Sequence, residues 1–275
     1  MPKIGLGKQP VDRHSPAMED AQPTVSIPAA TVIVFRRSSG GGAPEILMIT
    51  RHRAMAFAGG MAVFPGGRLD EADYELAAQI AGQLDPEEAA HRIAAIRETL
   101  EETGLAIGIA QVPTAAEAIE ARKLLLEGGV LAPVLEAMGW TLDLAAVVPF
   151  ARWHPKNERL PRIFDTRFYL ADLGTGAVEL EIDATENTHL FWTSAADALE
   201  AAERGEIALI FPTRRNLERL AEFASFDEAR AQAEAIPVRT ITPWMEERGG
   251  ERWLLIPADA GYPIDGEPLS SAHRA

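Results

Sequence analysis

The sequence predicts a mixed α/β fold of the α+β type, built as one domain with helical insertions. Short runs rich in β-branched and aromatic residues alternate with longer segments in which apolar residues recur every three or four positions. The chain has 275 residues, of which 47% are hydrophobic, so it can bury a substantial core. A sheet with helices packed on it is the simplest architecture for such a pattern.

The N-terminal part predicts a flexible segment followed by a β-hairpin. Residues 1–28 are rich in Pro, Gly and charged residues and show no periodicity, so we expect them to be flexible. Two β-rich runs, 31–37 and 45–52, flank a Ser-Ser-Gly-Gly-Gly-Ala-Pro turn segment and are expected to pair. Residues 61–67 predict a short strand that ends in Pro-Gly-Gly.

Residues 73–104 are expected to be largely helical, with a break near Gly82–Pro86. Asp85 is the expected N-cap, Pro86 occupies the first helical position, and Gly104 stands where the helix would stop. The buried face of this helix is expected to consist of Ala89, Ile93, Ile96 and Leu100. His91 lies on the other side, so we expect it to be exposed.

The rest of the chain continues the alternation. Helices are expected over 114–138, as a pair broken at Gly128–Gly129, and over 194–204, 213–223 and 226–235. Strands are expected over about 142–150, 163–171, 189–193 and 252–257. The Leu and Ala residues in 121–144 and 213–235 suit either an added helical layer, which we favour, or the face of a homodimer.

Composition excludes several classes of function. The 41 acidic and 26 basic residues give a formal net charge of −15, which should repel nucleic acids and anionic membranes. The absence of Cys excludes disulfides, thiolate metal sites and cysteine nucleophiles. No apolar stretch is long enough to span a membrane, and the N-terminus lacks the apolar region of a signal peptide, so we expect a cytoplasmic protein with no nucleic-acid or membrane partner.

A cluster of carboxylates carries the chemistry. Glu98, Glu101 and Glu102 are spaced i, i+3 and i+4, which places them on one helical face. Their mutual repulsion and their position near a helix C-terminus are both unfavourable without a cation. Hard oxygen ligands suit Mg²⁺ or Mn²⁺, which bridge to substrate phosphates. The alternative is a solvated acidic face, stabilised by Arg97 four residues before Glu101.

Two runs resemble the signature of the Nudix hydrolase family. Phe64-Pro65-Gly66-Gly67 matches its first half, and Arg97-Glu98-Thr99-Leu100-Glu101-Glu102-Thr103-Gly104-Leu105 matches its second. Asp73 stands where the family has Glu, and Thr99 where it usually has an aliphatic residue. The family has seven residues between that Glu and the Arg of the second half, whereas in this chain the 23 residues of 74–96 separate Asp73 from Arg97.

The long insertion points to one branch of the family. Together with the phrases at 162–171 and 207–220, it is similar to the coenzyme A diphosphatases related to the peroxisomal enzyme. The resemblance implies a Nudix-type mixed sheet sandwiched between helices over residues 29–236, with insertions at 74–96 and 113–140. The expected fold also has a C-terminal helical extension, and residues 237–275 would form a C-terminal extension of the domain.

The resemblance also implies roles for particular residues. Glu98, Glu101 and Glu102 would bind Mg²⁺ or Mn²⁺ and make a bound water more acidic, while Arg97 would orient them. Gly67 would shape the loop before the helix and allow close approach of metal or substrate. The general base would be a glutamate of this cluster or Glu186 on a later loop, for which a merely solvated carboxylate is the alternative.

The expected substrate is a small-molecule diphosphate. Hydrolysis of coenzyme A or acyl-CoA would give 3′,5′-ADP and (acyl-)phosphopantetheine. The residues expected to bind this substrate are Arg51, Arg53, Gly66, Gly67, Arg162 and Arg167. The alternatives are a diphosphatase for a nucleotide sugar, ADP-ribose or a dinucleotide, and a catalytically silent Nudix fold that serves as a ligand sensor or scaffold.

Overall fold

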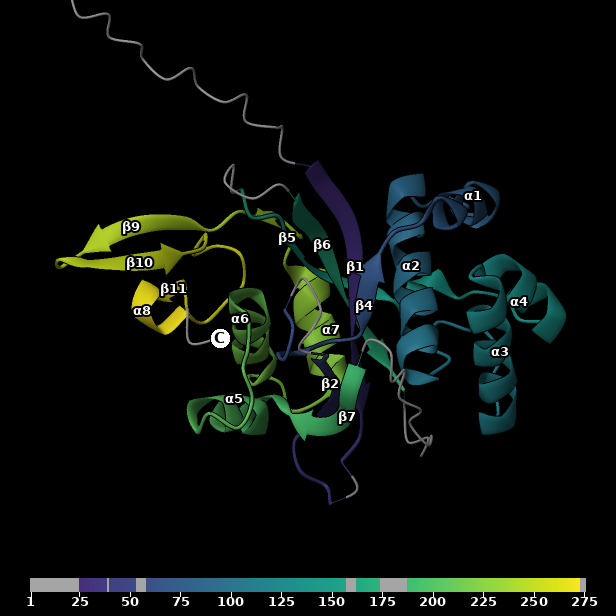
Figure 1. Ribbon diagram of the computed structural model, residues 1–275, viewed down its shortest axis with the longest axis horizontal. Coiled ribbons are helices and arrows are strands. Elements are labelled where there is room, and N and C mark those ends of the chain that lie inside the picture. Colours follow the sequence, from purple (N-terminus) through teal and green to yellow (C-terminus); the bar gives the residue numbers. More distant parts are fainter. Residues whose placement is uncertain (1–24, 39, 53–57, 157–161, 174–186, 273–275) are drawn as a thin grey trace, which may run out of the picture.

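An eight-stranded mixed sheet forms the centre of the computed structural model, which describes residues 25–38, 40–52, 58–156, 162–173 and 187–272 (Figure 1). The strands are β1 (Val25–Arg36), β2 (Glu45–Arg51), β3 (Ala62–Val63), β4 (Gly66–Arg68), β5 (Val148–Trp153), β6 (Arg162–Asp172), β7 (Asn187–Ser194) and β8 (Thr240–Ile241). Their order is β3-β2-β1-β6-β5-β8, with β4 paired to β1 and β7 paired to β2. The sheet is mixed because β1 runs parallel to β6 and β5 runs parallel to β8, whereas the other pairs are antiparallel.

The predicted hairpin is confirmed, but its first strand begins earlier than expected. Strands β1 and β2 pair antiparallel, with Phe35 opposite Ile46. Strand β1 starts at Val25, so the prediction of a flexible segment is wrong for residues 25–28. These residues pair with β6. This partner lies more than 130 residues away in the sequence, so local composition gives no signal for the pairing.

Each face of the sheet carries its own core. Along β1, Val32 and Val34 face one core while Ile33 and Phe35 face the other, as the two-residue period of a strand requires. The first core packs against α1 (Glu71–Ile80), α2 (Pro86–Thr103), α3 (Ala115–Gly128) and α4 (Leu131–Met138). The second packs against α5 (Ala195–Glu203), α6 (Phe211–Leu220) and α7 (Phe226–Ala235). Within the described residues, no helix combines the length and apolar character needed to cross a bilayer.

Helix α2 begins and ends where the sequence predicts. The Asp85 side chain accepts the Glu88 main-chain N–H at 3.0 Å, and Gly104 ends the helix in the left-handed conformation with φ of 75°. The predicted apolar face is buried. The prediction that His91 is exposed is wrong, since only 2% of its surface is accessible and its Nδ1 lies 2.7 Å from the Glu87 carbonyl oxygen. Packing on several sides of α2 buries residues that a one-sided helix would expose.

The predicted strand over 142–150 is only partly correct. A short 3₁₀ helix (Leu144–Ala146) precedes β5, and the Asp143 side chain caps it by accepting the Ala145 N–H at 3.1 Å. This local hydrogen bond competes with the extended conformation that the apolar residues favour.

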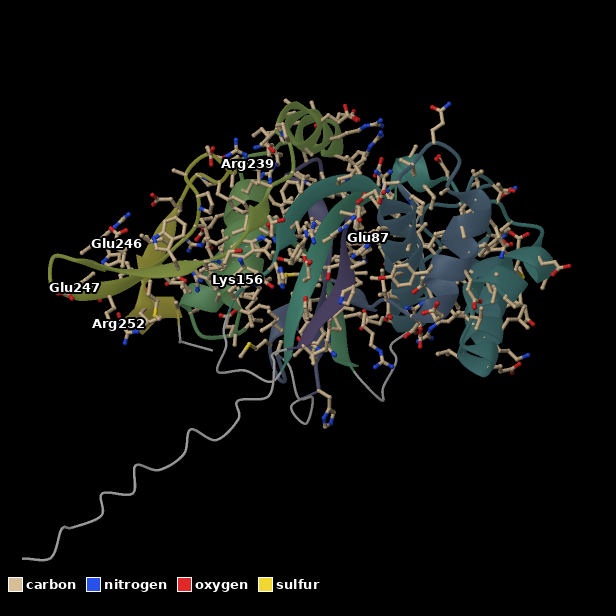
Figure 2. The ribbon with its side chains drawn as sticks, turned by 90° about the horizontal axis from the view of Figure 1, so that it is seen from above. Glu87, Lys156, Arg239, Glu246, Glu247 and Arg252 are labelled. Carbon is tan, nitrogen blue, oxygen red and sulfur yellow. The ribbon has the colours of Figure 1, made fainter. Side chains whose placement is uncertain are left out.

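The prediction of a C-terminal helical extension is wrong. After β8 the chain forms a separate three-stranded sheet of β9 (Trp244–Arg248), β10 (Glu251–Leu255) and β11 (Gly266–Pro268), followed only by the short α8 (Leu269–Ala272). Glu246, Glu247 and Arg252 lie on the β9–β10 hairpin, which projects away from the main sheet (Figures 1 and 2). The sequence did predict β10, because its apolar run is local.

Candidate active site

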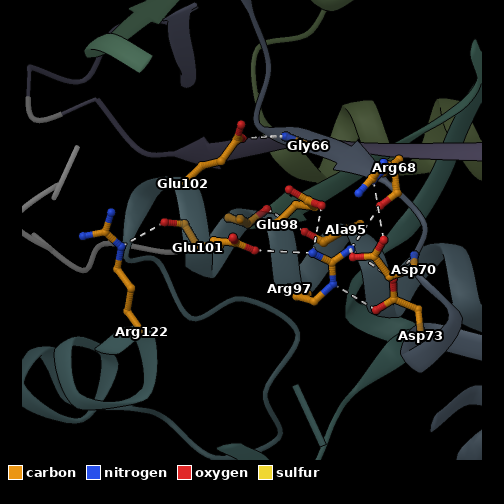
Figure 3. Close-up of polar contacts among 11 residues, drawn as sticks. Gly66, Arg68, Asp70, Asp73, Ala95, Arg97, Glu98, Glu101, Glu102 and Arg122 are labelled. Carbon is orange, nitrogen blue, oxygen red and sulfur yellow. Dashed lines mark hydrogen bonds and ion pairs between the residues drawn. The ribbon is translucent and has the colours of Figure 1, made fainter. Parts of the chain in front are cut away.

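The carboxylate cluster lies on the C-terminal half of α2, where this helix packs against β4 (Figure 3). Strand β4 contains the glycines of the Phe-Pro-Gly-Gly run, so the two halves of the predicted signature meet in space. They meet although the signature spacing is interrupted by residues 74–96.

Arg97 is the central buried group of this site. Its side chain is 4% exposed, and its guanidinium forms a two-point hydrogen bond with the Asp73 carboxylate, with both N···O distances at 3.0 Å. A third hydrogen bond at 3.0 Å goes to the main-chain oxygen of Arg68. Such a fork fixes the plane of the guanidinium as well as its position.

The remaining edge of Arg97 faces two of the glutamates. Its Nη1 lies 2.8 Å from Glu98 and 3.4 Å from Glu101. Burial alone would lower the pKa of Arg97, but its hydrogen bonds to the Asp73 carboxylate and the charge of Glu98 outweigh this effect, so the pKa is raised. The guanidinium is therefore a permanent positive charge that holds both carboxylates on one side of α2.

Glu98 lies beneath the glycine turn, with 15% of its side chain exposed. Burial raises the pKa of Glu98 to about 7, against the lowering effect of Arg97, and the charge of Glu101 adds to the rise. Gly67 lies directly over its carboxyl group, and a Cβ atom at position 67 would overlap the Glu98 carboxyl atoms. The chain thus needs glycine at position 67 in order to leave room for this side chain.

Glu102 is held by the preceding glycine. The Gly66 main-chain N–H donates to the Glu102 carboxylate at 2.9 Å. Gly66 has a φ of +151°, and a Cβ atom there would collide with the Ala30 carbonyl oxygen on β1. Only glycine fits this position, and its conformation aims the N–H at Glu102.

Glu101 is the most accessible of the three carboxylates, with 34% of its side chain exposed. Its main-chain oxygen accepts a hydrogen bond at 2.9 Å from the guanidinium of Arg122 on α3. A cation at the carbonyl end of a helix offsets the unfavourable effect of acidic side chains there. Arg122 and Arg97 together therefore stabilise an otherwise repulsive end of α2.

The donor set fits a hard divalent cation in its chemistry. Carboxylate oxygens are the ligands that Mg²⁺ and Mn²⁺ prefer. In the conformation described, however, Glu98 and Glu101 are bound by Arg97, and Glu102 is bound by Gly66. Among the residues that the structure describes, no three acidic or histidine side chains converge closely enough to hold a metal ion.

The cations expected to bind substrate are placed differently from one another. Arg51 ends β2, where its main chain bonds to Gly60 and Met61 at 3.0 and 3.1 Å. Arg167 forms ion pairs of 2.6 Å with Glu87 and Glu88 at the start of α2. With a rise of 1.5 Å per helical residue, that end of α2 lies about 15 Å along the helix from Glu98. The structure therefore does not bring Arg167 to the carboxylate cluster.

The side chains of three other expected site residues are not described by the structure. Arg53 and Glu186 lie outside the described residues, and only the main chain of Arg162 is described, at the start of β6. Gly66, Gly67, Arg97 and the three glutamates are the ones that the structure brings together.

Sequence reasoning missed two residues that position the site. The signature marks the position of Asp73, but it does not predict that this carboxylate accepts hydrogen bonds both from Arg97, at 3.0 Å, and from the main-chain N–H of Asp70, at 2.9 Å. The Asp-x-x-Asp spacing of 70–73 is a capping-box pattern and could have signalled this helix start. Arg122 carried no local signal, because its acceptor lies on another helix.

Comparisons with known proteins found two relatives that are similar over most of this chain. No protein-family model matches the chain. The chain is 26% identical over 310 aligned positions to the acyl-coenzyme A diphosphatase NUDT19 of Gallus gallus, covering 86% of this chain and 80% of that protein. It is 28% identical, with a TM-score of 0.64, to the crystal structure of a Nudix hydrolase from Alicyclobacillus acidocaldarius, covering 76% of this chain and 96% of the other.

The mixed sheet between helices, the Gly66–Gly67 turn over the carboxylates and these two likenesses support a hydrolase similar to the Nudix enzymes. Within that class the chain resembles the coenzyme A diphosphatases, represented by the Gallus gallus relative.

Proposed function

We propose that this chain hydrolyses the diphosphate linkage of coenzyme A or acyl-CoA in the presence of Mg²⁺ or Mn²⁺. The products would be 3′,5′-ADP and phosphopantetheine or its acylated form. The likeness to an acyl-coenzyme A diphosphatase over most of both chains supports this substrate class. The carboxylate cluster on α2 supports the chemistry, because a diphosphate substrate needs cations beside it.

Glu98, Glu101 and Glu102 would hold the metal. When bound, a divalent cation would neutralise the phosphate oxygens and make a bound water more acidic. Arg97 fixes Glu98 and Glu101 in position, since Asp73 and the Arg68 main-chain oxygen lock its guanidinium. Gly66 and Gly67 let β4 lie directly against these carboxylates, because a Cβ atom at either position would overlap its neighbours.

One observation carries the proposal. A buried Arg97 holds two glutamates while the Gly66 N–H holds the third, so a like-charged cluster is kept together on one side of α2. Repulsion among these carboxylates destabilises the fold, so a purely structural protein gains nothing from keeping them close together. A metal-dependent diphosphatase needs such carboxylates as metal ligands.

The test is a hydrolysis assay of coenzyme A with Mg²⁺ or Mn²⁺ that measures both products. Glu101→Gln is expected to lower kcat by at least about 100-fold, because it removes one ligand charge from the metal site. Its fold should persist, since Glu101 is partly exposed and its main-chain contact to Arg122 is kept. Glu120→Gln on α3, whose side chain is 53% exposed, is the matched control and should retain full activity.

Three outcomes would contradict the proposal. Near-normal turnover by Glu101→Gln would refute the site. Hydrolysis of ADP-ribose, a nucleotide sugar or a dinucleotide without hydrolysis of coenzyme A would refute the substrate class while keeping the chemistry. Absence of hydrolysis with every diphosphate would favour a ligand sensor or scaffold.

A further inference from the structure

A cavity of about 480 Å³ lies beside β3, between this strand and the connection from α5 to α6. Its walls include Thr50, Gly60, Ala62, Ala208, Arg214 and Glu267. This volume is typical of a site for a small organic molecule. The described residues that line it include none of the glutamates of the α2 cluster, so it is a separate space.

The arginines in the cavity wall are neutralised by the wall itself. Arg204 pairs with Glu206 at 2.7 Å, and Arg214 pairs with Glu203 at 2.6 Å. All four residues line the cavity. Each of these two arginines therefore already has a carboxylate beside it, so the pairs add no net positive charge to the wall.

The third acid of the wall is also compensated. Glu267 lies 3.4 Å from the guanidinium of Arg215, whose side chain is 2% exposed and also pairs with Glu218 at 2.7 Å. The cavity wall is therefore polar without a surplus of positive charge. It does not suit a phosphate group, and it does suit an uncharged ligand with hydrogen-bonding groups.

The α5–α6 connection offers hydrogen-bond donors to such a ligand. In the part of the chain that is described, the main-chain N–H groups of Ile207, Ala208 and Leu209 donate to no protein acceptor. These three residues all line the cavity. Main-chain donors in a row can bind the carbonyl oxygens of amides. Ala62 lies beside this connection, since its main-chain N–H donates to the Ala208 carbonyl oxygen at 2.8 Å, and neither Gly60 nor Ala62 has a bulky side chain.

The cavity lies close to the carboxylate cluster along the chain. Ala62 in its wall is four residues before Gly66, which contacts Glu102, so the Cα atoms of Ala62 and Gly66 are at most about 14 Å apart. The pantetheine arm of coenzyme A has about twelve bonds between its phosphate oxygen and its sulfur, which corresponds to about four residues of extended main chain. The arm is uncharged and carries two amides.

We propose that this cavity binds the pantetheine arm when the diphosphate lies at the α2 carboxylates. This inference rests on the proposed function and adds the element that would distinguish coenzyme A from other diphosphates. Recognition would come from the N–H groups of 207–209 and from a wall whose charges are already paired.

The test compares two substrates that differ only in the arm. One is coenzyme A, and the other is the methyl ester of 3′-phospho-ADP, in which a methyl group replaces pantetheine. Ala208→Trp, which fills the cavity, is expected to lower kcat/KM for coenzyme A by about tenfold and to change that for the methyl ester less than about twofold. Ser271→Trp on another part of the wall should act in the same way. Ala224→Trp, in the exposed α6–α7 connection, is the control and should change neither value.

The failures of the two proposals are distinguishable. If the parent protein hydrolyses coenzyme A and both cavity variants retain its kcat/KM, the inference about the arm is overturned and the proposed function stands. Equal losses for both substrates in both variants would also overturn it. If the parent protein hydrolyses other diphosphates and not coenzyme A, the proposed substrate falls and the inference falls with it.

Discussion

Replacing Arg97 with lysine tests whether the site depends on the guanidinium fork or only on a positive charge. Lysine keeps the charge but presents a single ammonium group at the end of a flexible chain. It can reproduce one of the two hydrogen bonds to Asp73, and it loses the bond to the Arg68 main-chain oxygen or the contact with Glu98.

The expected loss follows from these contacts. A hydrogen bond to a charged group contributes about 1.5–3 kcal/mol to the free energy of unfolding. Two such bonds are lost in a side chain that is only 4% exposed, so solvent cannot replace them. The retained charge and local relaxation return part of this energy. We therefore expect Arg97→Lys to lower the free energy of unfolding by about 3 kcal/mol.

Urea denaturation followed by circular dichroism measures this change. The control is Arg230→Lys on α7, where the parent arginine pairs with Glu234 at 2.7 Å but both side chains are at least half exposed. An exposed pair of this kind contributes under about 1 kcal/mol, so the control should shift the midpoint little. A loss below about 1 kcal/mol in Arg97→Lys would refute the argument that the fork holds the site together.

Three further substitutions probe other contacts. Gly67→Ala should lower kcat at least tenfold and cost about 1–3 kcal/mol in unfolding free energy, because the added methyl group overlaps Glu98. Burial lowers the pKa of His91 despite its contact with the Glu87 carbonyl, so the parent protein should lose stability as the pH falls below about 6.5. Urea titrations at about pH 7.5 and 5.5 should show a smaller loss of unfolding free energy for His91→Asn than for the parent. Tyr262→Phe should lower the melting temperature and cost about 1–3 kcal/mol, because it leaves two buried hydrogen-bond partners unpaired.

Each of these has its own control. Gly128→Ala adds a methyl group with no atom within 4 Å, so it should leave kcat unchanged, and an equal effect of both alanines would remove the steric explanation. For His91, the folded state binds fewer protons than the unfolded state, so an identical pH response of parent and variant would contradict the burial argument. For Tyr262, which links Trp153 to Asn216 at 3.0 and 2.7 Å, an unchanged melting temperature would show that the link contributes nothing.

The sequence predicts those parts of the fold that depend on neighbouring residues. Helix α2 starts at a capping Asp, ends at a left-handed Gly and buries its apolar stripe, and all three signals lie within the helix itself. The C-terminal sheet and the start of β1 depend on partners far along the chain, so local propensity could not settle them. The prediction that His91 is exposed is wrong for the same reason, since burial depends on which elements pack around the helix.

In the candidate site, too, local spacing predicts some features, whereas others depend on residues far apart in the sequence. The spacing of the glutamates predicts one helical face, but it gives no information on what compensates their charge. Compensation comes from Arg97, and Arg97 is fixed by Asp73, from which it is separated by 23 residues. Asp73 lies in the first turn of α1 and also caps that helix through the Asp70 N–H, so the inserted residues continue as helix without moving the carboxylate. The insertion lengthens the path between Asp73 and Arg97 and leaves their contact at 3.0 Å, because its residues form most of α1 and the first part of α2, which pack against each other. A spacing rule applied to the sequence alone therefore fails at this point, whereas the ion pair that the spacing normally ensures is still formed.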